Sequence, residues 1–135
     1  MDNQFSALKN EILGRKYDLS IAFVSEQKSR ELNKKYRGKD KATNVLSFAL
    51  SEKGGELILS PEVIRKELKK FDKTFDELLV FLVIHGMLHL KGMQHSSTME
   101  KLEDKYGQKY FSWNRRGLFH HQSGDRRIFK RRKKS

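Results

Sequence analysis

The sequence predicts an α+β domain in which a small mixed sheet is covered by helices. Strand patterns are confined to residues 17–59, whereas the pattern of residues 60–106 is helical. Strands followed by helices are typical of this class, because sheets and helices bury their apolar faces against each other. No internal repeat and no Pro- or Gly-rich linker divides residues 1–111, so we expect them to form one domain.

Five elements are predicted in the first half of the chain. They are a helix at 4–13, a strand at 17–23, a helix ending near residue 36, a strand at 43–50 and a strand at 56–59. Ser25 is a candidate N-cap of the second helix, on which Leu32 and Tyr36 share a face. The glycine pair Gly54-Gly55 turns the chain into the last strand.

Three helices are predicted in the second half. They are a helix at 61–71, a helix that begins at residue 75 and a helix that runs from a capping box at 97–100 to residue 106. Ser60 is a plausible N-cap, and Thr74 with Glu77 forms another capping box. Leu78–Ile84 is apolar on every side, which indicates a central buried helix, and Gly107 is expected to stop the last helix.

The composition excludes several classes of protein. With 36% hydrophobic and 34% charged residues, the chain has enough apolar residues for a core, so disorder of the whole chain is not expected. Met1–Gln4 does not resemble a signal peptide, and Leu78–Ile84 is too short to span a membrane. The lack of cysteine excludes disulfides and leaves nitrogen and oxygen as metal ligands. We therefore expect a soluble cytoplasmic protein without a membrane partner.

The net charge of +12 is concentrated near the C-terminus. Nine Lys or Arg residues and a single Asp lie between Trp113 and Ser135. Such a field attracts nucleic acid, anionic lipid or an acidic protein, and the lack of an amphipathic apolar face disfavours a membrane. We expect residues 112–135 to form a basic tail. For Lys130–Lys134, two interpretations are equally consistent with the sequence: a disordered, solvated segment and a segment that contacts nucleic acid.

Three histidines form the most informative pattern in the chain. His85 and His89 are four residues apart on the predicted buried helix, so their imidazoles project from one face, one turn apart. Gly92 can adopt the left-handed conformation that ends a helix and would return His95 toward the same point. Two histidines at this spacing are more often surface or core residues, but the third histidine and the buried helix favour a metal site.

Three neutral nitrogen donors suit Zn²⁺, with one ion per chain and a fourth position left for water. A structural zinc normally has a fourth protein ligand, usually Cys, and the chain has none. An open position is typical of catalytic zinc, which can activate water at neutral pH. The adjacent His120 and His121 belong to the basic tail and are expected to be solvated instead.

Gly86 separates this pattern from that of zinc proteases with a His-Glu-x-x-His motif. Those enzymes have a glutamate general base directly after the first histidine, where this chain has Gly86. The spacing of the later glycine and third histidine matches that of the metzincins, so we expect a metzincin-like metal cleft with ligands on a central buried helix. Glu100 and Glu103 are the only nearby carboxylates, and both are interpreted as capping or surface residues of the last helix.

Four segments carry a resemblance to one protein family. They are Leu32–Lys41, Thr43–Phe48, Gly55–Ser60 and the pattern His85-Gly86-x-Leu88-His89-Leu90-x-Gly92-x-x-His95. On these segments, which lie within residues 19–106, the chain resembles the YbeY family of bacterial rRNA maturation endoribonucleases. The histidine pattern is the most specific of the four.

The resemblance implies that His85, His89 and His95 bind zinc and that Arg37 is the catalytic arginine. It also implies hydrolysis of single-stranded RNA, a role in 16S rRNA maturation, and partners on the small ribosomal subunit. A fixed guanidinium can bind two phosphate oxygens at once, which agrees with this role for Arg37. The structural alternative for Arg37 is a cation favoured by the dipole at a helix C-terminus.

Several residues depart from the family pattern. Gln94 stands where the family usually has Asp, and its amide can donate and accept hydrogen bonds but carries no charge. Ala42 and Ala49 stand where proline is frequent. Lys39 and Lys41 could line the path of the substrate, although a solvated basic loop is at least as consistent with the sequence.

The leading hypothesis is a single-strand-specific, zinc-dependent endoribonuclease involved in 16S rRNA maturation and ribosome quality control. Residues 1–111 would form the metal-dependent hydrolase domain. Whether water or the ribose 2′-OH attacks is left open. One alternative is a non-catalytic, metal-stabilised assembly factor that binds rRNA, and another is a metalloprotease-like hydrolase with a base supplied from elsewhere.

Overall fold

The computed structural model describes residues 3–114 and 117–119. Its elements alternate between helix and strand in the first half and are helical in the second. In chain order they are α1 (Asn3–Ile12), β1 (Asp18–Phe23), α2 (Glu26–Arg37), β2 (Val45–Ser51), β3 (Gly54–Leu59), α3 (Pro61–Lys66), α4 (Leu68–Phe71), α5 (Phe75–Leu90) and α6 (Ser97–Phe111). The predicted α+β class, with a small mixed sheet covered by helices, is confirmed.

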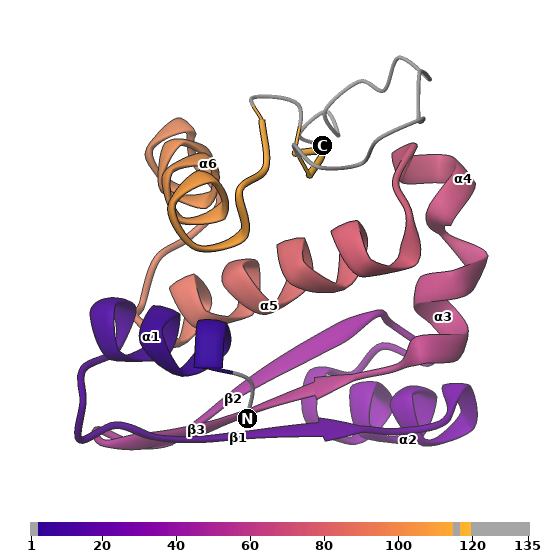
Figure 1. The fold of residues 1–135 in the computed structure, drawn as a ribbon. Helices are drawn as coiled ribbons and strands as arrows, with labels where there is room; N and C mark the ends of the chain where they lie inside the picture. The colour runs from indigo at the N-terminus through magenta and orange to yellow at the C-terminus, as the bar shows by residue number, and fades with distance from the viewer. Residues whose placement is uncertain (1–2, 115–116, 120–135) are drawn as a thin grey trace.

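The three strands form a sheet with the order β1-β3-β2. β1 runs parallel to β3, whereas β2 pairs with β3 in the antiparallel direction and has an irregularity between Ala49 and Ser51. Helix α5 crosses one face of this sheet, and α1 and α6 pack against α5 (Figure 1). β2 is therefore an edge strand that lies next to the central helix.

Adjacent residues of β2 point to opposite faces of the sheet. The Ser47 hydroxyl donates to the carbonyl of Gly86 on α5 at 3.4 Å, whereas the ring of Phe48 contacts Tyr36 of α2. This alternation is the ordinary geometry of a strand. Helices α5 and α2 consequently lie on opposite faces of the sheet (Figure 1).

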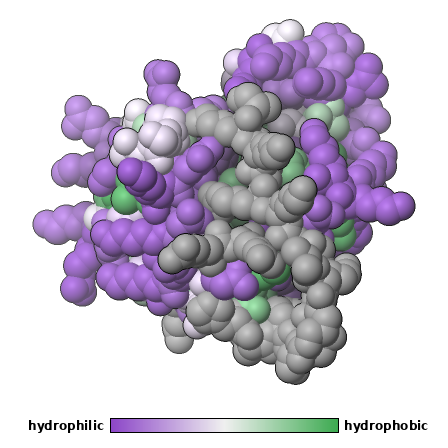
Figure 2. Space-filling view, turned by 90° about the horizontal axis from the view of Figure 1, so that it is seen from above, coloured by the Kyte–Doolittle hydropathy of each residue, from purple (hydrophilic) through white to green (hydrophobic). Residues whose placement is uncertain are grey.

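The core is built around α5, which is buried over most of its length. The largest fully buried side chains of β3, α3 and α5 are Leu57, Leu59, Ile64, Leu78, Leu82, Ile84, Met87 and Leu88. By contrast, the described residues on the face above α5 and α6 are mostly hydrophilic (Figure 2). Across the described ranges, no helix combines the length and apolar character needed to cross a membrane.

Three of the predicted caps are present. Ser60 accepts a hydrogen bond from the amide of Val63 at the start of α3. Ser25 accepts a hydrogen bond from the amide of Lys28 at the start of α2, and Thr74 with Glu77 forms the expected capping box of α5. The inner face of α2 differs from the apolar face suggested by Leu32 and Tyr36, because its fully buried residues are Ser29 and Asn33. Both bind the backbone of the following loop, as described below.

The predicted helix at 61–71 is wrong, because the chain forms two short helices with a break at Glu67, where φ is −102° and ψ is 0°. The prediction for the last helix is also wrong at both ends. Ser96, not Ser97, is the N-cap, and α6 continues through Gly107 to Phe111. Gly107 lacks a side chain because the Trp113 indole occupies the space that a Cβ would fill.

The segment after α6 folds back onto the domain. Ser112 adopts the left-handed conformation with φ 56°, and Trp113 is completely buried. Farther along, the buried Lys73 ammonium donates to the carbonyl of Gly117 at 3.3 Å. His120, His121 and the rest of the predicted basic tail lie outside the described residues, so the division of the chain at residue 111 stays a prediction.

We predict that Gly107→Ala destabilises the fold. In an exposed helix this change stabilises by about 1 kcal/mol. Here the new methyl group would overlap the buried indole of Trp113, and overpacking of a core costs about 1–3 kcal/mol. Urea unfolding should show a lower free energy of unfolding for Gly107→Ala than for Gln108→Ala, an exposed control on the same helix. Equal stability of the two variants would contradict this packing.

Candidate metal centre and its cleft

The structure brings His85, His89 and His95 together. His85 and His89 lie one turn apart on α5, and the chain then reverses through Gly92, whose φ is 106°. The amide of Met93 donates to the carbonyl of Leu88 at 3.0 Å and closes this turn. One ligand nitrogen from each histidine lies within 4.8 Å of the other two, so the three residues could hold a metal ion.

Two of the histidines are oriented by contacts through their Nδ1 atoms. His85 Nδ1 lies 2.6 Å from a carboxylate oxygen of Glu103, and His89 Nδ1 lies 2.9 Å from the carbonyl oxygen of Met93. Because both oxygens act as acceptors, both Nδ1 atoms are donors, which leaves each Nε2 of the neutral rings with a lone pair. Phe81 also stacks on His85, with ring centres 5.6 Å apart.

The resulting arrangement fits a cation. The Nε2 atoms of His85 and His89 lie 3.0 Å apart, so two lone pairs face each other. A shared cation removes this repulsion, and a tetrahedral zinc with bonds of 2.0–2.1 Å places two nitrogens about 3.4 Å apart. The donor set contains three imidazoles and no thiolate, which leaves a coordination position open.

His89 is held in the form that can bind a metal. Burial, and secondly the proximity of His85, lower the pKa of His89 below its ordinary value. A lowered pKa keeps the imidazole neutral to more acidic pH, and only the neutral ring has a lone pair for a metal. The ring is also half-buried, whereas His95 is exposed.

Glu103 corrects the sequence analysis, in which it was interpreted as a capping or surface residue of the last helix. Its side chain is 3% exposed and points from α6 to His85. Glu100 does not make this contact and is only partly buried. The packing of α6 on α5 could not be read from the sequence, so the spacing of Glu103 from the histidines gave no signal of its role.

Gly86 is required by the packing of α5 on the sheet. A Cβ at this position would lie 2.6 Å from Cδ2 of Leu57 and 3.2 Å from Oγ of Ser47. Leu57 is fully buried in β3, so it has little room to move. The position after the first histidine therefore faces the sheet and cannot carry the glutamate of a His-Glu-x-x-His protease.

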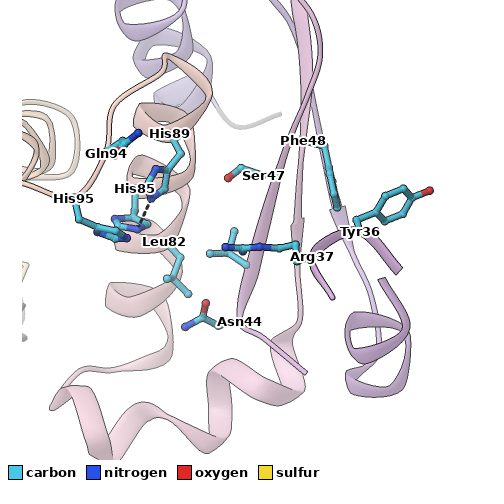
Figure 3. Close-up of a pocket in the computed structure, with 11 residues that line it drawn as sticks. Tyr36, Arg37, Asn44, Ser47, Phe48, Leu82, His85, His89, Gln94 and His95 are labelled. Atoms are coloured by element: carbon cyan, nitrogen blue, oxygen red, sulfur yellow. Dashed lines mark hydrogen bonds between the residues drawn. The ribbon is translucent and has the colours of Figure 1, made fainter. Parts of the chain in front are cut away.

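The histidines line one wall of a cleft of about 720 Å³. Its other lining residues come from the end of α2, from β2 and the residue before it, and from α5 and the turn that follows. They are Tyr36, Arg37, Asn44, Val45, Ser47, Phe48, Leu82 and Gln94. In Figure 3, the Arg37 side chain extends past β2 toward the wall that carries the histidines. The predicted Arg37 and Gln94 thus share one cleft with the histidine cluster.

Arg37 is held by the way α2 ends. Gly38 adopts the left-handed conformation with φ 71°, and its amide donates to the carbonyl of Lys34 at 3.1 Å. The loop that follows is bound to α2, because the side-chain amide of Asn33 donates to the backbone carbonyl of Lys41 at 2.9 Å. Ser29 likewise bonds both backbone groups of Thr43. The backbone of Arg37, the last residue of α2, is therefore fixed in position.

Lys39 and Lys41 are both exposed and, among the described residues, are not part of the lining of this cleft. Lys41 instead borders a separate surface hollow with Ser25, Arg30 and Asp40. A contact of Lys39 or Lys41 with a substrate is therefore expected only outside the cleft, along its approach. The aromatic residues Tyr36 and Phe48 were missed as site residues, because a pattern of strand and helix cannot indicate which side chains meet at a sheet edge.

We predict that Glu103→Gln weakens metal binding. The amide keeps the shape of the side chain but removes the charge that fixes and polarises His85, and changes of this kind typically cost about 10- to 100-fold in metal affinity. Competition for Zn²⁺ with a chromophoric chelator measures the effect. Glu100→Gln, on the same helix but away from His85, is the matched control. An unchanged affinity in Glu103→Gln would show that the contact has no role in binding.

Comparisons with known proteins identify the family of the chain. The family model described as endoribonuclease YbeY matches residues 2–110. An endoribonuclease YbeY of Neisseria meningitidis is 44% identical over 102 residues, which cover 67% of this chain and 59% of the relative. One from Halalkalibacterium halodurans is 38% identical over 101 residues, which cover 63% of this chain and 64% of the relative.

A solution structure of a Thermotoga maritima protein is also similar, with a TM-score of 0.59 and 30% identity. The match covers 80% of this chain and 79% of that one. The chain spans about three fifths of the length of the curated relatives it matches. With the family model matching most of its length, the chain belongs to the YbeY family.

Proposed function

We propose that this protein is a zinc-dependent endoribonuclease that cleaves single-stranded RNA. The observation that carries the proposal is the cleft in which a three-histidine cluster and Arg37 line one cavity. A cation site and a guanidinium in one cleft suit a phosphodiester, because negative charge develops on the phosphate oxygens during cleavage. The relatives are named endoribonucleases, which supports the same reaction.

His85, His89 and His95 would hold the zinc ion, and Glu103 would orient His85. When bound, the ion would serve as a Lewis acid toward a phosphate oxygen or a water molecule. The protein's own part is to orient the imidazoles, and the Nδ1 contacts of His85 and His89 direct their Nε2 atoms toward one another before any ion arrives. These two rings are preorganised, so binding would not require them to rotate.

Arg37 would bind the phosphate. Its guanidinium can donate two parallel hydrogen bonds to a phosphate, which both neutralises and orients the group. The fixed end of α2 limits the positions that this side chain can reach. Gln94, also in the lining, can donate to or accept from a ligand but cannot act as a general base.

The biological setting is part of the proposal. We infer that the substrate is 16S rRNA, that the partners belong to the small ribosomal subunit, that the role is rRNA maturation and ribosome quality control, and that the protein is cytoplasmic. The net charge of +12 supports a polyanionic partner. It does not by itself distinguish one RNA from another.

A metalloprotease is less well supported by the same residues. Gly86 faces Leu57 and Ser47 and has no room for a side chain. The carboxylate of Glu103 is buried against His85, so it is not available as a general base toward a substrate. The other alternative, an assembly factor that binds rRNA without cutting it, differs from the proposal in a measurable way.

We predict that His89→Ala abolishes both zinc binding and cleavage. Removing one of three ligands leaves too few donors to retain a catalytic zinc. The measurement is cleavage of single-stranded RNA by wild type and variant purified identically, with zinc content determined for each. Retention of one zinc per chain by the variant would overturn the assignment of the site. RNA binding by the wild type without new RNA ends under any metal condition would favour the assembly factor.

We predict that Arg37→Ala lowers the cleavage rate about 10²- to 10³-fold, the usual effect of removing one group that stabilises charge in a transition state. Zinc content should not change, because Arg37 is not a ligand. Arg15→Ala removes the same charge from an exposed site outside the cleft lining and is the control. Equal rates for the two variants would mean that Arg37 has only a structural role.

A further inference from the structure

Two aromatic side chains stand at the outer side of the cleft. Tyr36 is 57% exposed, an unusual position for a large ring, and Phe48 beside it is half-buried. Their ring centres are 5.2 Å apart with an interplanar angle of 68°. Both line the cleft that contains the histidines, but they lie on the opposite side of β2 (Figure 3).

The edge of β2 connects the two sides of the cleft. On one side, Ser47 faces α5 and the histidines; on the other, Phe48 faces Tyr36 (Figure 3). Arg37 follows Tyr36 directly in the chain, and successive residues of a helix point in different directions. The end of α2 thus aims Arg37 past the strand edge toward the histidines while Tyr36 stays with Phe48. A single RNA strand whose phosphate is bound by Arg37 would therefore cross the edge of β2 to place a neighbouring nucleotide beside the two rings.

The charges around the rings fit a polyanion. Five cationic residues lie within positions 34–41, with Asp40 as the one acidic residue of that segment. Arg30 binds the Asp40 carboxylate at 2.8 Å, which offsets its charge. The Lys35 ammonium lies 5.1 Å from the centre of the Tyr36 ring, on an exposed side chain that can turn to a phosphate. Aromatic rings with flanking cations are the usual means of binding single-stranded nucleic acid.

We infer that Tyr36 and Phe48 form a stacking subsite for a nucleobase next to the phosphate that Arg37 holds. This inference rests on the proposed function and extends it to a specific contact. A base exposes its face only when it is unpaired and unstacked, so the subsite favours single strands over duplexes. Because every base has such a face, we expect little preference for sequence at this position.

The test measures binding without cleavage. The full chain, kept metal-free with a chelator, is titrated into a fluorescently labelled single-stranded RNA oligomer, and anisotropy gives the affinity. A second oligomer of equal length has the same ribose-phosphate backbone but no bases. The variants are Tyr36→Leu and Phe48→Leu, which keep an apolar side chain. The control is Phe23→Leu, because Phe23 is also 57% exposed but does not line the cleft.

We expect Tyr36→Leu to bind the intact oligomer about tenfold more weakly, which equals about 1.4 kcal/mol and lies within the usual range for one stacked base. Phe48→Leu should show a similar loss, and Phe23→Leu should bind as wild type does. On the oligomer without bases, wild type and Tyr36→Leu should bind equally. A 2-aminopurine base in the intact oligomer should lose fluorescence on wild type and less on Tyr36→Leu.

Two results would overturn the subsite while leaving the proposed function intact. One is a wild type that binds and cuts RNA while Tyr36→Leu loses no more than Phe23→Leu. The other is an equal loss on both oligomers, which would assign the ring to backbone contact or to folding. If wild type neither binds nor cuts single-stranded RNA, the proposed function fails together with the subsite.

Discussion

The close approach of α5 to the sheet at Gly86 sets the position of everything in the cleft. Without a side chain there, the helix backbone lies against Leu57 of β3 and Ser47 of β2. The same helix turn carries His85, so the depth at which α5 sits fixes the distance between the histidine cluster and the strand edge. A glycine that looks like a missing catalytic residue in the sequence is therefore a packing requirement in the fold.

A second constraint joins α5, which carries His85 and His89, to α6, which carries Glu103. Glu103 is a buried carboxylate, and burial of such a group is costly unless it is paired with a donor. His85 supplies that donor, so α6 is tied to α5 by the same contact that orients a proposed metal ligand. A change that displaces α6 would consequently also disturb the orientation of His85.

The sequence was sufficient for features that depend on local periodicity. The presence of three strands, the capping box at Thr74 and the placement of His85 and His89 on one helix were predicted correctly, since each depends on neighbours in the chain. Gly54 and Gly55, predicted as a turn, are instead the first residues of β3. Features that depend on packing between distant elements were not. Glu103 and the extension of α6 past Gly107 both follow from tertiary contacts, with His85 and with Trp113 respectively. Arg37 was located through family resemblance, because its helix-terminal position alone suggests a simpler role.

β2 has a further consequence as the wall of the cleft. Within the described sheet it pairs only with β3, so its outer backbone groups are open to another strand. Proteins commonly cover such an edge to prevent aggregation, but covering this one would close the cleft. The irregularity at Ala49–Ser51 and the surplus of positive charge are the remaining safeguards, and salt weakens the second. The tendency of the protein to aggregate is thereby linked to the openness of its cleft.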